Sequence, residues 1–268
     1  MTERAGQKTT IRGTREWAVA EINCCLGCRH GCRYCYGRHD AVVRKGLMTV
    51  EQWDFCRVIE KEVMRKHPLY PGQVMFPTAH DIVPENLEAC VIVLKNLLAA
   101  GNRVLVVSKP NIESVRRICM DFNQFRDLLL FRFTITARDS RILEFWEPGA
   151  PDYAERKSCL KYAFDEGFET SVSVEPMLDT TDVVSMVREL LPYISHSIWL
   201  GKMNRIEERV KIDSEHMRLE IERIRQGQRD EKLWELYRAL KPYDKVRWKE
   251  SVKEVLGITM PSEPGLDI

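Results

Sequence analysis

The sequence has no long apolar run and almost no net charge. No stretch of its 268 residues approaches the roughly 20 consecutive apolar residues that a membrane-spanning helix needs. Residues 1–13 also lack the apolar core of a secretory signal. We therefore expect a protein of the cytoplasm with no membrane partner. Its net charge of +1 is far from the strongly basic character of most nucleic-acid-binding domains.

A linker rich in proline, glycine or serine is also missing, which favours one large domain over two. Disulfides are not expected in a reducing compartment, although the chain has nine cysteines. In such a compartment, metal binding or simple burial is the usual role of a cysteine.

Short β-rich runs alternate with helical patterns from about residue 17, as in βα units around a parallel sheet. The expected strands are 17–23, 74–76, 104–107, 129–136, 170–174 and 197–200. Apolar residues at helical spacing follow several of them, including one face over 53–63. Six repeated right-handed crossovers favour an α/β fold, a partial (β/α)6 TIM-like barrel, with a doubly wound sheet as the alternative.

The chain changes character after the sixth expected strand. Residues 213–240 are highly charged and helical in pattern, and the apolar stripe of Met217, Ile221 and Ile224 is expected to pack on the barrel. We divide the sequence into an N-terminal segment (1–16), a barrel core (17–205) and a C-terminal helical extension (206–268).

Three cysteines, Cys28, Cys32 and Cys35, follow the first expected strand, at the strand end where parallel α/β folds build active sites. Their thiolates can converge on one soft metal centre, and three leave one iron of a four-iron cluster without a protein ligand. Cys25 offers a fourth thiol. The run lacks the two separated ligand pairs of a structural zinc site. A fully liganded electron-transfer cluster would leave the barrel without an evident purpose.

Basic residues crowd this loop. They are Arg29, Arg33, Arg38, Arg44 and Lys45, with only Asp40 against them. They suit an anionic substrate, or they form a solvated face.

The cysteine run resembles that of radical S-adenosylmethionine (SAM) enzymes, with three and then two residues between the cysteines and aromatic Tyr34 before the last. Further segments resemble the branch of spore photoproduct lyase and DNA repair photolyase-like proteins. They are 23–39, 76–86, 108–110, 147–151 and 155–156. The resemblance covers roughly residues 15–205 and is most specific at the cysteines.

This resemblance implies a [4Fe–4S] cluster on Cys28, Cys32 and Cys35 whose unique iron chelates the amino and carboxylate groups of SAM. An electron from a donor such as flavodoxin or ferredoxin cleaves SAM, and the resulting 5′-deoxyadenosyl radical abstracts a hydrogen atom from substrate. The substrate is not identified. Nucleic-acid chemistry like that of spore photoproduct lyase is one expectation, although the chain has no clear DNA-binding stripe and no assured hydrogen-donating cysteine. No catalytic residue is assigned.

The resemblance also implies contacts to SAM from the cysteine loop and the second strand end. Tyr34 is expected beside the adenine, with Tyr36 close to it. Thr78, His80 and Asp81 stand where the family carries a Gly-Gly-Glu-like stretch for the methionine amino group. The chain departs from that pattern, so backbone carbonyls or the Asp81 carboxylate would take this role.

Later strand ends supply the remaining expected contacts. Lys109, next to Ser108, is expected to pair with the SAM carboxylate. The ribose and substrate side is expected to receive Thr136, Arg138 and Glu175, with Lys202 and Asn204 facing substrate.

The other cysteines are expected to be buried. Cys24 and Cys25 are interpreted as neighbours of the cluster, although a thiol there could pass an electron or a hydrogen atom. Inert core positions on helix faces are expected for Cys56, Cys90, Cys119 and Cys159.

Two other function classes stay open. One is a nucleic-acid-binding module in which the cysteines hold zinc and the arginines of the loop grip phosphates. The other is an iron–sulfur electron carrier without SAM chemistry.

Overall fold

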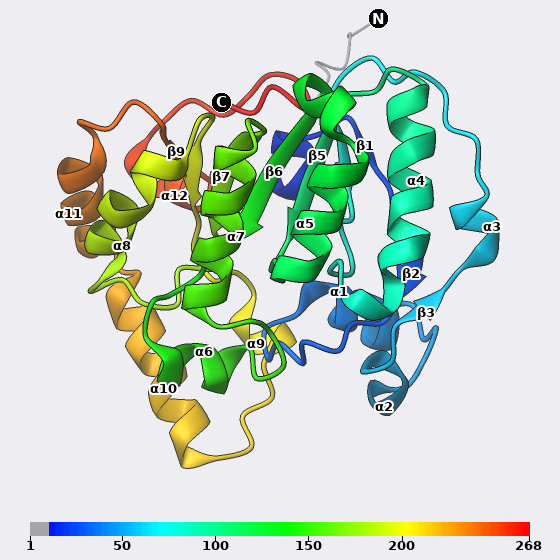
Figure 1. Cartoon of the computed structure of the whole chain (residues 1–268). Coiled ribbons are helices and arrows are strands. Elements are labelled where there is room, and N and C mark those ends of the chain that lie inside the picture. Colours follow the sequence, from blue (N-terminus) through cyan, green and yellow to red (C-terminus); the bar gives the residue numbers. More distant parts are fainter. Residues whose placement is uncertain (1–10) are drawn as a thin grey trace, which may run out of the picture.

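A seven-stranded parallel sheet forms the centre of the computed structural model, which describes residues 11–268 (Figure 1). In order across the sheet, the strands are β1 (Ala20–Glu21), β4 (Val74–Phe76), β5 (Val104–Ser108), β6 (Leu129–Thr134), β7 (Glu169–Val174), β8 (Ile198–Leu200) and β9 (Val246–Trp248). Spatial order follows sequence order, so each crossover adds the next strand to the same edge. The sheet curls into a partial barrel with β1 and β9 as its edges, which confirms the expected fold class.

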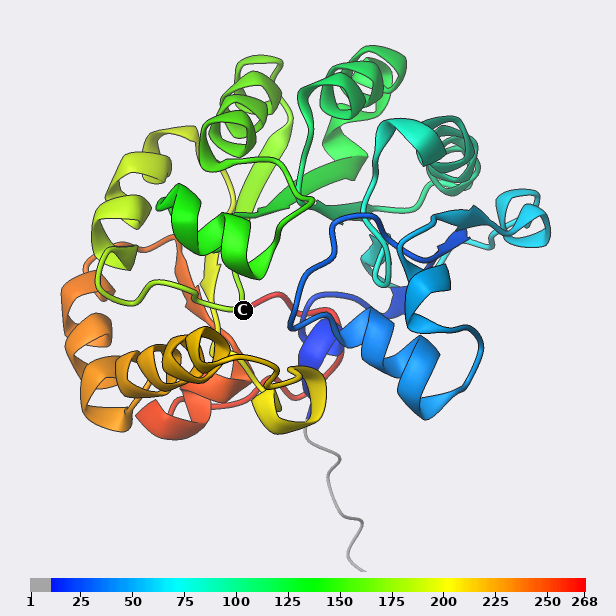
Figure 2. The same cartoon turned by 90° about the horizontal axis from the view of Figure 1, so that it is seen from below.

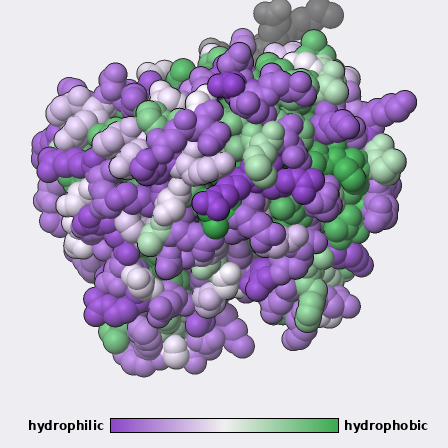
Figure 3. All heavy atoms as spheres, in the orientation of Figure 1, coloured by the Kyte–Doolittle hydropathy of each residue, from purple (hydrophilic) through white to green (hydrophobic). Residues whose placement is uncertain are grey.

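Helices form an outer ring around this sheet (Figure 2). They are α4 (Leu87–Ala99), α5 (Ile112–Asp121), α7 (Tyr153–Asp165), α8 (Val183–Leu190), α11 (Asp230–Leu240) and α12 (Glu250–Leu256). Local chemistry fixes their ends: the Asn111 side chain accepts the Ser114 N–H at the start of α5, and Gly167 takes a φ of +80° just after α7. Their outward faces are largely hydrophilic, with apolar side chains gathered toward the side of α4 (Figure 3).

Shorter elements lie mainly around the two ends of the barrel. They are η1 (Gly13–Glu16), β2 (Cys25–Leu26), α1 (Tyr36–Arg38), η2 (His39–Arg44), α2 (Val50–Trp53), β3 (Arg57–Val58), α3 (Glu60–Val63), η3 (Pro84–Asn86), η4 (Asn123–Leu128), α6 (Ser140–Trp146), η5 (Leu191–Tyr193), α9 (Ile206–Arg209) and α10 (Glu215–Gly227). The cysteine loop therefore sits in a layer of short elements rather than in a regular βα unit.

Successive side chains along each strand point to opposite faces of the sheet, so the strands contribute to two separate apolar cores. Phe76, Val106 and Phe133 point outward into the large core beneath the helices. Met75, Leu105, Leu130 and Trp199 point inward and pack with Trp17 in a small core inside the barrel. The inner core fills the amino end of the barrel and leaves its carboxyl end open for a site.

The first expected strand is mostly wrong. Only Ala20–Glu21 of 17–23 pairs with β4, because η1 and the following turn carry Trp17 into the inner core instead. The expected helix over 53–63 is also wrong. Here β3 pairs antiparallel with β2 and separates the one-turn helices α2 and α3.

The C-terminal part contains a seventh strand that the sequence did not suggest. β9 pairs in parallel with β8, and α12 follows it, so the residues after 240 continue the βα pattern of the barrel. The expected segment 1–16 lies mostly outside the described residues, which begin at 11. Within residues 11–268, no helix combines the length and apolar character needed to cross a bilayer.

Candidate functional site

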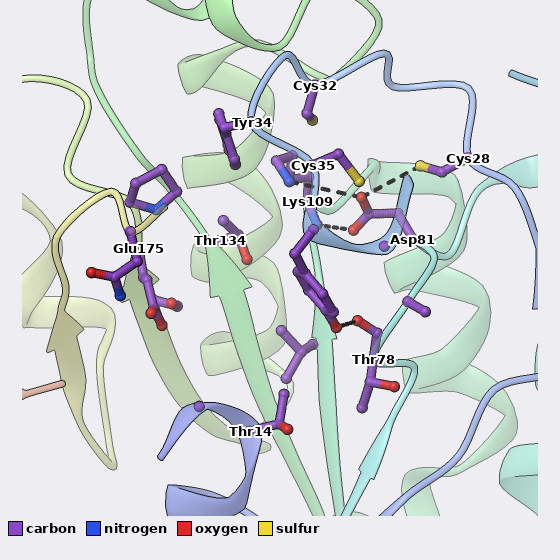
Figure 4. A pocket seen from close by; sticks show the side chains of 18 of the residues that line it. Thr14, Cys28, Cys32, Tyr34, Cys35, Thr78, Asp81, Lys109, Thr134 and Glu175 are labelled. Atoms are coloured by element: carbon purple, nitrogen blue, oxygen red, sulfur yellow. Dashed lines mark hydrogen bonds and ion pairs between the residues drawn. The ribbon is translucent and has the colours of Figure 1, made fainter. Parts of the chain in front are cut away.

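A cavity of about 400 Å³ opens at the carboxyl ends of the strands, beside the cysteine loop (Figure 4). Its wall includes Thr134 at the end of β6, Ser173 in β7 and Glu175 just after it, together with the loop after β4. This volume falls within the range of about 300–1,000 Å³ that is typical of small-molecule sites. The cavity is therefore large enough to hold a cofactor.

The three cysteines of the loop, Cys28, Cys32 and Cys35, all line this cavity. Backbone hydrogen bonds fix the loop, from Cys28 N–H to the Trp53 carbonyl at 2.8 Å and from Arg33 N–H to the Trp146 carbonyl at 2.9 Å. Gly27 has a φ of +101°, and a Cβ there would collide with the carbonyl oxygen of Phe55. A side chain at Gly27 would thus push the cysteines off the cavity wall.

Burial determines the protonation of these thiols. It raises the pKa of Cys28 to about 12 and the pKa of Cys32 well above its ordinary value. Cys28 and Cys32 are therefore neutral unless a bound metal displaces their protons. Three thiols on one cavity wall, Cys32 buried and Cys28 and Cys35 half-buried, form a soft donor set of the kind that binds iron–sulfur clusters or zinc, so the residues present fit a cluster.

Asp81 links the cysteine loop to the end of β5. Its Oδ1 accepts the Lys109 N–H at 2.7 Å and the Ser108 hydroxyl at 2.9 Å, and its Oδ2 lies 2.9 Å from His30 Nδ1. Burial by itself raises the pKa of this carboxyl, but the Lys109 ammonium and His30 bring it well below its usual range. Cys28, His30 and Asp81 hold ligand atoms within 4.8 Å of one another, yet both Asp81 oxygens are already engaged in hydrogen bonds.

Lys109 points into the cavity near the cysteines (Figure 4). Its Nζ lies 3.9 Å from Asp81 Oδ2 and 5.8 Å from the centre of the Tyr34 ring. Burial by itself lowers the pKa of Lys109, but the surrounding thiol, phenol and carboxyl groups raise it well above its usual value. The side chain thus remains a cation that can attract a carboxylate.

A buried ion pair supports Tyr34 from behind. The Tyr34 hydroxyl donates to Glu147, which also accepts the Thr136 hydroxyl at 2.8 Å. Glu147 Oε2 lies 2.6 Å from Arg156 Nη2, and both side chains are fully buried. Burial alone raises the pKa of Glu147, but Arg156 and then Lys109 lower it, so Glu147 is ionised. Glu147 and Arg156, which belong to the segments that resemble the spore photoproduct lyase branch, therefore hold the Tyr34 ring in place.

The opposite wall carries charges of both signs. Glu175 faces Lys249, whose Nζ is 3.9 Å from Glu175 Oε2, and burial raises the pKa of Glu175. Arg209, from α9, lies over the Tyr36 ring at 6.0 Å. Lys249 directly follows β9, so its place in the site could not be inferred without that strand.

Most residues expected at the site do meet there. The cavity is lined by Cys28, Cys32, Cys35, Tyr34, Tyr36, Thr78, His80, Asp81, Lys109, Glu175, Lys202 and Asn204. Ser108 and Thr136 lie just behind the wall, bonded to Asp81 and Glu147. Arg138 is not brought to the cavity, because its guanidinium pairs with Asp182 and Glu189.

Sequence reasoning missed several residues of the site. The cavity wall also contains Thr134, Ser173, Arg209 and Lys249. Asn23 was missed as a support: its Oδ1 accepts the N–H groups of Thr78 and Ala79 at 2.9 and 2.7 Å. Asn23 precedes the first cysteine and lies in the resembling segment, which was the available signal.

Comparisons with known proteins give matches among solved structures only. No protein-family model matches the chain, and no curated protein matches it. A cysteine-to-alanine variant of spore photoproduct lyase with dinucleoside spore photoproduct superposes with a TM-score of 0.55 at 15% identity, covering 85% of this chain and 75% of that one. A variant with bound AdoMet and the same dinucleoside gives 0.51 at 14% identity, covering 92% and 79%.

A third structure of this fold is SuiB from Streptococcus suis. It superposes with a TM-score of 0.52 at 8% identity, covering 87% of this chain and 49% of that one. At such low identity the likeness establishes the fold. The resemblance to the spore photoproduct lyase branch is thus confirmed at the level of the fold.

Proposed function

We propose that this chain is a radical SAM enzyme with a [4Fe–4S] cluster on Cys28, Cys32 and Cys35. One observation carries the proposal: the thiols of Cys28, Cys32 and Cys35 and the Lys109 ammonium line the same cavity, at the carboxyl end of the sheet. The shared fold with spore photoproduct lyase, including a structure with AdoMet bound, supports it. All nine cysteines are free thiols, which fits a reducing compartment such as the cytoplasm.

When bound, the cluster supplies the electron that cleaves SAM to methionine and a 5′-deoxyadenosyl radical, which abstracts a hydrogen atom from substrate. The residues of the chain bind and orient SAM. Lys109 attracts the carboxylate of its methionine part, and Asp81 holds the Lys109 backbone in position. The segment Thr78 to Asp81 offers backbone carbonyls and one carboxylate to the amino group, and Asn23 fixes this segment.

The adenosine part has an aromatic and a polar wall to contact. Tyr34, which is held by Glu147, packs beside the adenine, and Tyr36 donates its hydroxyl to the Thr78 carbonyl on the other side. Glu175 accepts the ribose hydroxyls. The inner core below excludes water from the amino end of the barrel.

The remaining wall favours an anionic substrate. Lys202 and Arg209 line it, so a phosphate group would find cationic partners there, whereas the buried Lys249 ammonium is already paired with Glu16 at 2.8 Å. Nucleic acid is therefore the first candidate, in line with the dinucleoside in the spore photoproduct lyase structures. Among the described residues, the cysteines on the cavity wall are the three assigned to the cluster. A thiol that returns hydrogen to the product has to come from elsewhere, or the reaction does not need one.

The two alternative functions receive less support. As a zinc-stabilised nucleic-acid module, the protein would need free arginines, but Arg29 pairs with Glu85 and Arg44 with Asp40. Arg33 donates to the Phe145 carbonyl at 2.6 Å. A simple electron carrier would have no use for a cavity of about 400 Å³ beside its cluster.

Replacing Cys32 tests the proposal. The wild-type chain, purified and reconstituted without oxygen, should contain iron and sulfide, and should form 5′-deoxyadenosine from SAM after reduction by dithionite, flavodoxin or ferredoxin. Cys32→Ala should lose the cluster and reduce 5′-deoxyadenosine at least 100-fold, because the cluster then lacks one of its three ligands. Cys119→Ala, at a buried position of α5, should keep both the cluster and SAM cleavage. SAM cleavage at the wild-type rate in Cys32→Ala would refute the proposal.

A further inference from the structure

Behind the cysteine loop lies a second group of thiols, which we term the rear thiol cluster. It comprises Cys24, Cys25, Cys56 and Cys90, with the imidazole of His80. Cys24 and Cys90 are fully buried, Cys25 is 2% exposed and His80 is 6% exposed. Four segments distant in sequence contribute: the bend at Cys24 with the first residue of β2, the residue before β3, the loop after β4 and the first turn of α4. The proposed function uses none of the four thiols.

Three of these groups, Cys24, Cys25 and His80, have the spacing of metal ligands, and Cys90 adjoins them through Cys24. Cys24 Sγ lies 3.8 Å from Cys25 Sγ, 3.8 Å from Cys90 Sγ and 3.9 Å from His80 Nε2. Zinc–sulfur bonds of about 2.3 Å in a tetrahedron put neighbouring sulfurs about 3.8 Å apart. The ligand atoms of Cys24, Cys25 and His80 also lie within 4.8 Å of one another. One ion at the centre of the group can therefore reach several ligands at once.

The backbone turns the two adjacent cysteines to the same side. Successive side chains of a regular strand point to opposite faces. Cys24, however, lies at a bend between β1 and β2, and its thiol and that of Cys25 converge. Cys90 adds a thiol from the first turn of the 13-residue helix α4.

His80 is held in the tautomer that a metal ligand needs. Its Nδ1 lies 3.1 Å from the carbonyl oxygen of Asp81 and donates to it. The lone pair is therefore on Nε2, the nitrogen that faces the thiols, where it accepts the Cys24 N–H at 3.3 Å and has to exchange this hydrogen bond for the ion. Metal-ligating histidines commonly donate their other ring N–H to a backbone carbonyl in this way.

We propose that Cys24, Cys25, Cys90 and His80 bind one zinc ion. The three thiols lose their protons to solvent and bind the ion as thiolates, and Nε2 of His80 is the fourth ligand. Cys24, Cys25 and His80 already stand together, and the Cys90 side chain has to turn toward them. Cys56 is a further thiol beside the site, held by the Asn86 amide at 3.2 Å. The ion joins the bend before β2, the start of α4 and the loop that carries Asp81. It thereby steadies the wall to which the cysteine loop is bonded, and it uses none of Cys28, Cys32 and Cys35.

Metal analysis of the full chain tests this site separately from the cluster. We expect about one zinc per chain in wild-type protein purified under reducing conditions, in addition to any iron. Cys90→Ser should lower the zinc content at least tenfold and keep the iron, whereas Cys32→Ala should lose the iron and keep the zinc. Cys159→Ser, a fully buried cysteine of α7, is the matched control and should keep both metals.

Several results would overturn the zinc site. These are wild-type protein without zinc after zinc is added, zinc retained in Cys90→Ser, or a disulfide between Cys24 and Cys90 in place of a metal. If Cys90→Ser does not fold, the zinc site is tested by adding cobalt to the Cys32→Ala variant, which lacks the iron–sulfur cluster. A tetrahedral thiolate site gives intense sulfur-to-cobalt absorption, and its absence refutes the proposal.

Discussion

Asp81 is the residue on which the cavity wall depends most. Its carboxylate is 14% exposed and accepts hydrogen bonds from Ser108, Lys109 and His30. Asp81→Asn removes the charge beside the buried Lys109 ammonium and one acceptor oxygen. We expect it to lower the free energy of unfolding by roughly 2–4 kcal/mol, measured by urea denaturation.

The control for this variant is Asp165→Asn, which breaks an exposed ion pair with Lys161. Its cost should stay below about 1 kcal/mol, because exposed pairs contribute little. An equal effect of the two substitutions would contradict the central role of Asp81.

At the scale of residues, the sequence could predict which side chains reach the site when their partners are close by in the chain. Cys28, Cys32 and Cys35 lie within eight residues, and all three reach the cavity. Arg138 could not be placed, because its carboxylate partners come from the next βα unit. The contacts of the rear thiol cluster were likewise hidden, since Cys24 and Cys90 are 66 residues apart.

At the scale of elements, Glu189 of α8 ties its helix to its neighbours. It lies 2.6 Å from Lys157 of α7 and 2.6 Å from Arg138, which follows β6. These hydrogen bonds, first from Lys157, lower the pKa of Glu189 to about 2. A depressed carboxyl pKa stabilises the fold above the unfolded value of about 4.3, and this contribution is lost as the pH falls toward the folded pKa.

We therefore expect Glu189→Gln to lower the melting temperature more at pH 7 than at pH 3. The effect should be a few degrees at most, because Glu189 is 30% exposed and its ion pairs are partly screened. Thermal denaturation of both proteins at the two pH values measures this difference. A difference that is constant with pH would show that the charge of Glu189 does not contribute.

Longer strands were predicted well, and short ones were not. β5 and β6 have five and six mostly apolar, buried residues, and the six residues of β7 are mostly buried and include the β-branched Thr170, Val172 and Val174, so all three stand out in the sequence. β9 has three residues with Arg247 between two apolar ones, so nothing separates it from the charged helices before it. β2 and β3 have two residues each and owe their existence to pairing with one another.

At the scale of the whole molecule, the C-terminal residues close the amino end of the barrel. Asp267 Oδ2 lies 2.8 Å from Nη2 of Arg132, which is fully buried beneath the rings of Trp17 and Trp199. Arg132 Nε also donates to the Ser171 hydroxyl at 2.9 Å. A contact between residues 135 positions apart is invisible to local patterns, because a polar residue inside a strand run gives no hint of its partner.

Breaking the ion pair between Arg132 and Asp267 should show how much the C-terminal residues contribute to the stability of the barrel. Asp267 has a φ of +57°, which asparagine tolerates well, so Asp267→Asn removes the charge without adding backbone strain. We expect a loss of roughly 2–4 kcal/mol in the free energy of unfolding, because the buried guanidinium is left without a counter-charge. In an Arg132→Met background the same substitution should cost less than about 1 kcal/mol. Equal costs in the two backgrounds, measured by urea denaturation, would mean that the tail is held by its backbone contacts and not by this ion pair.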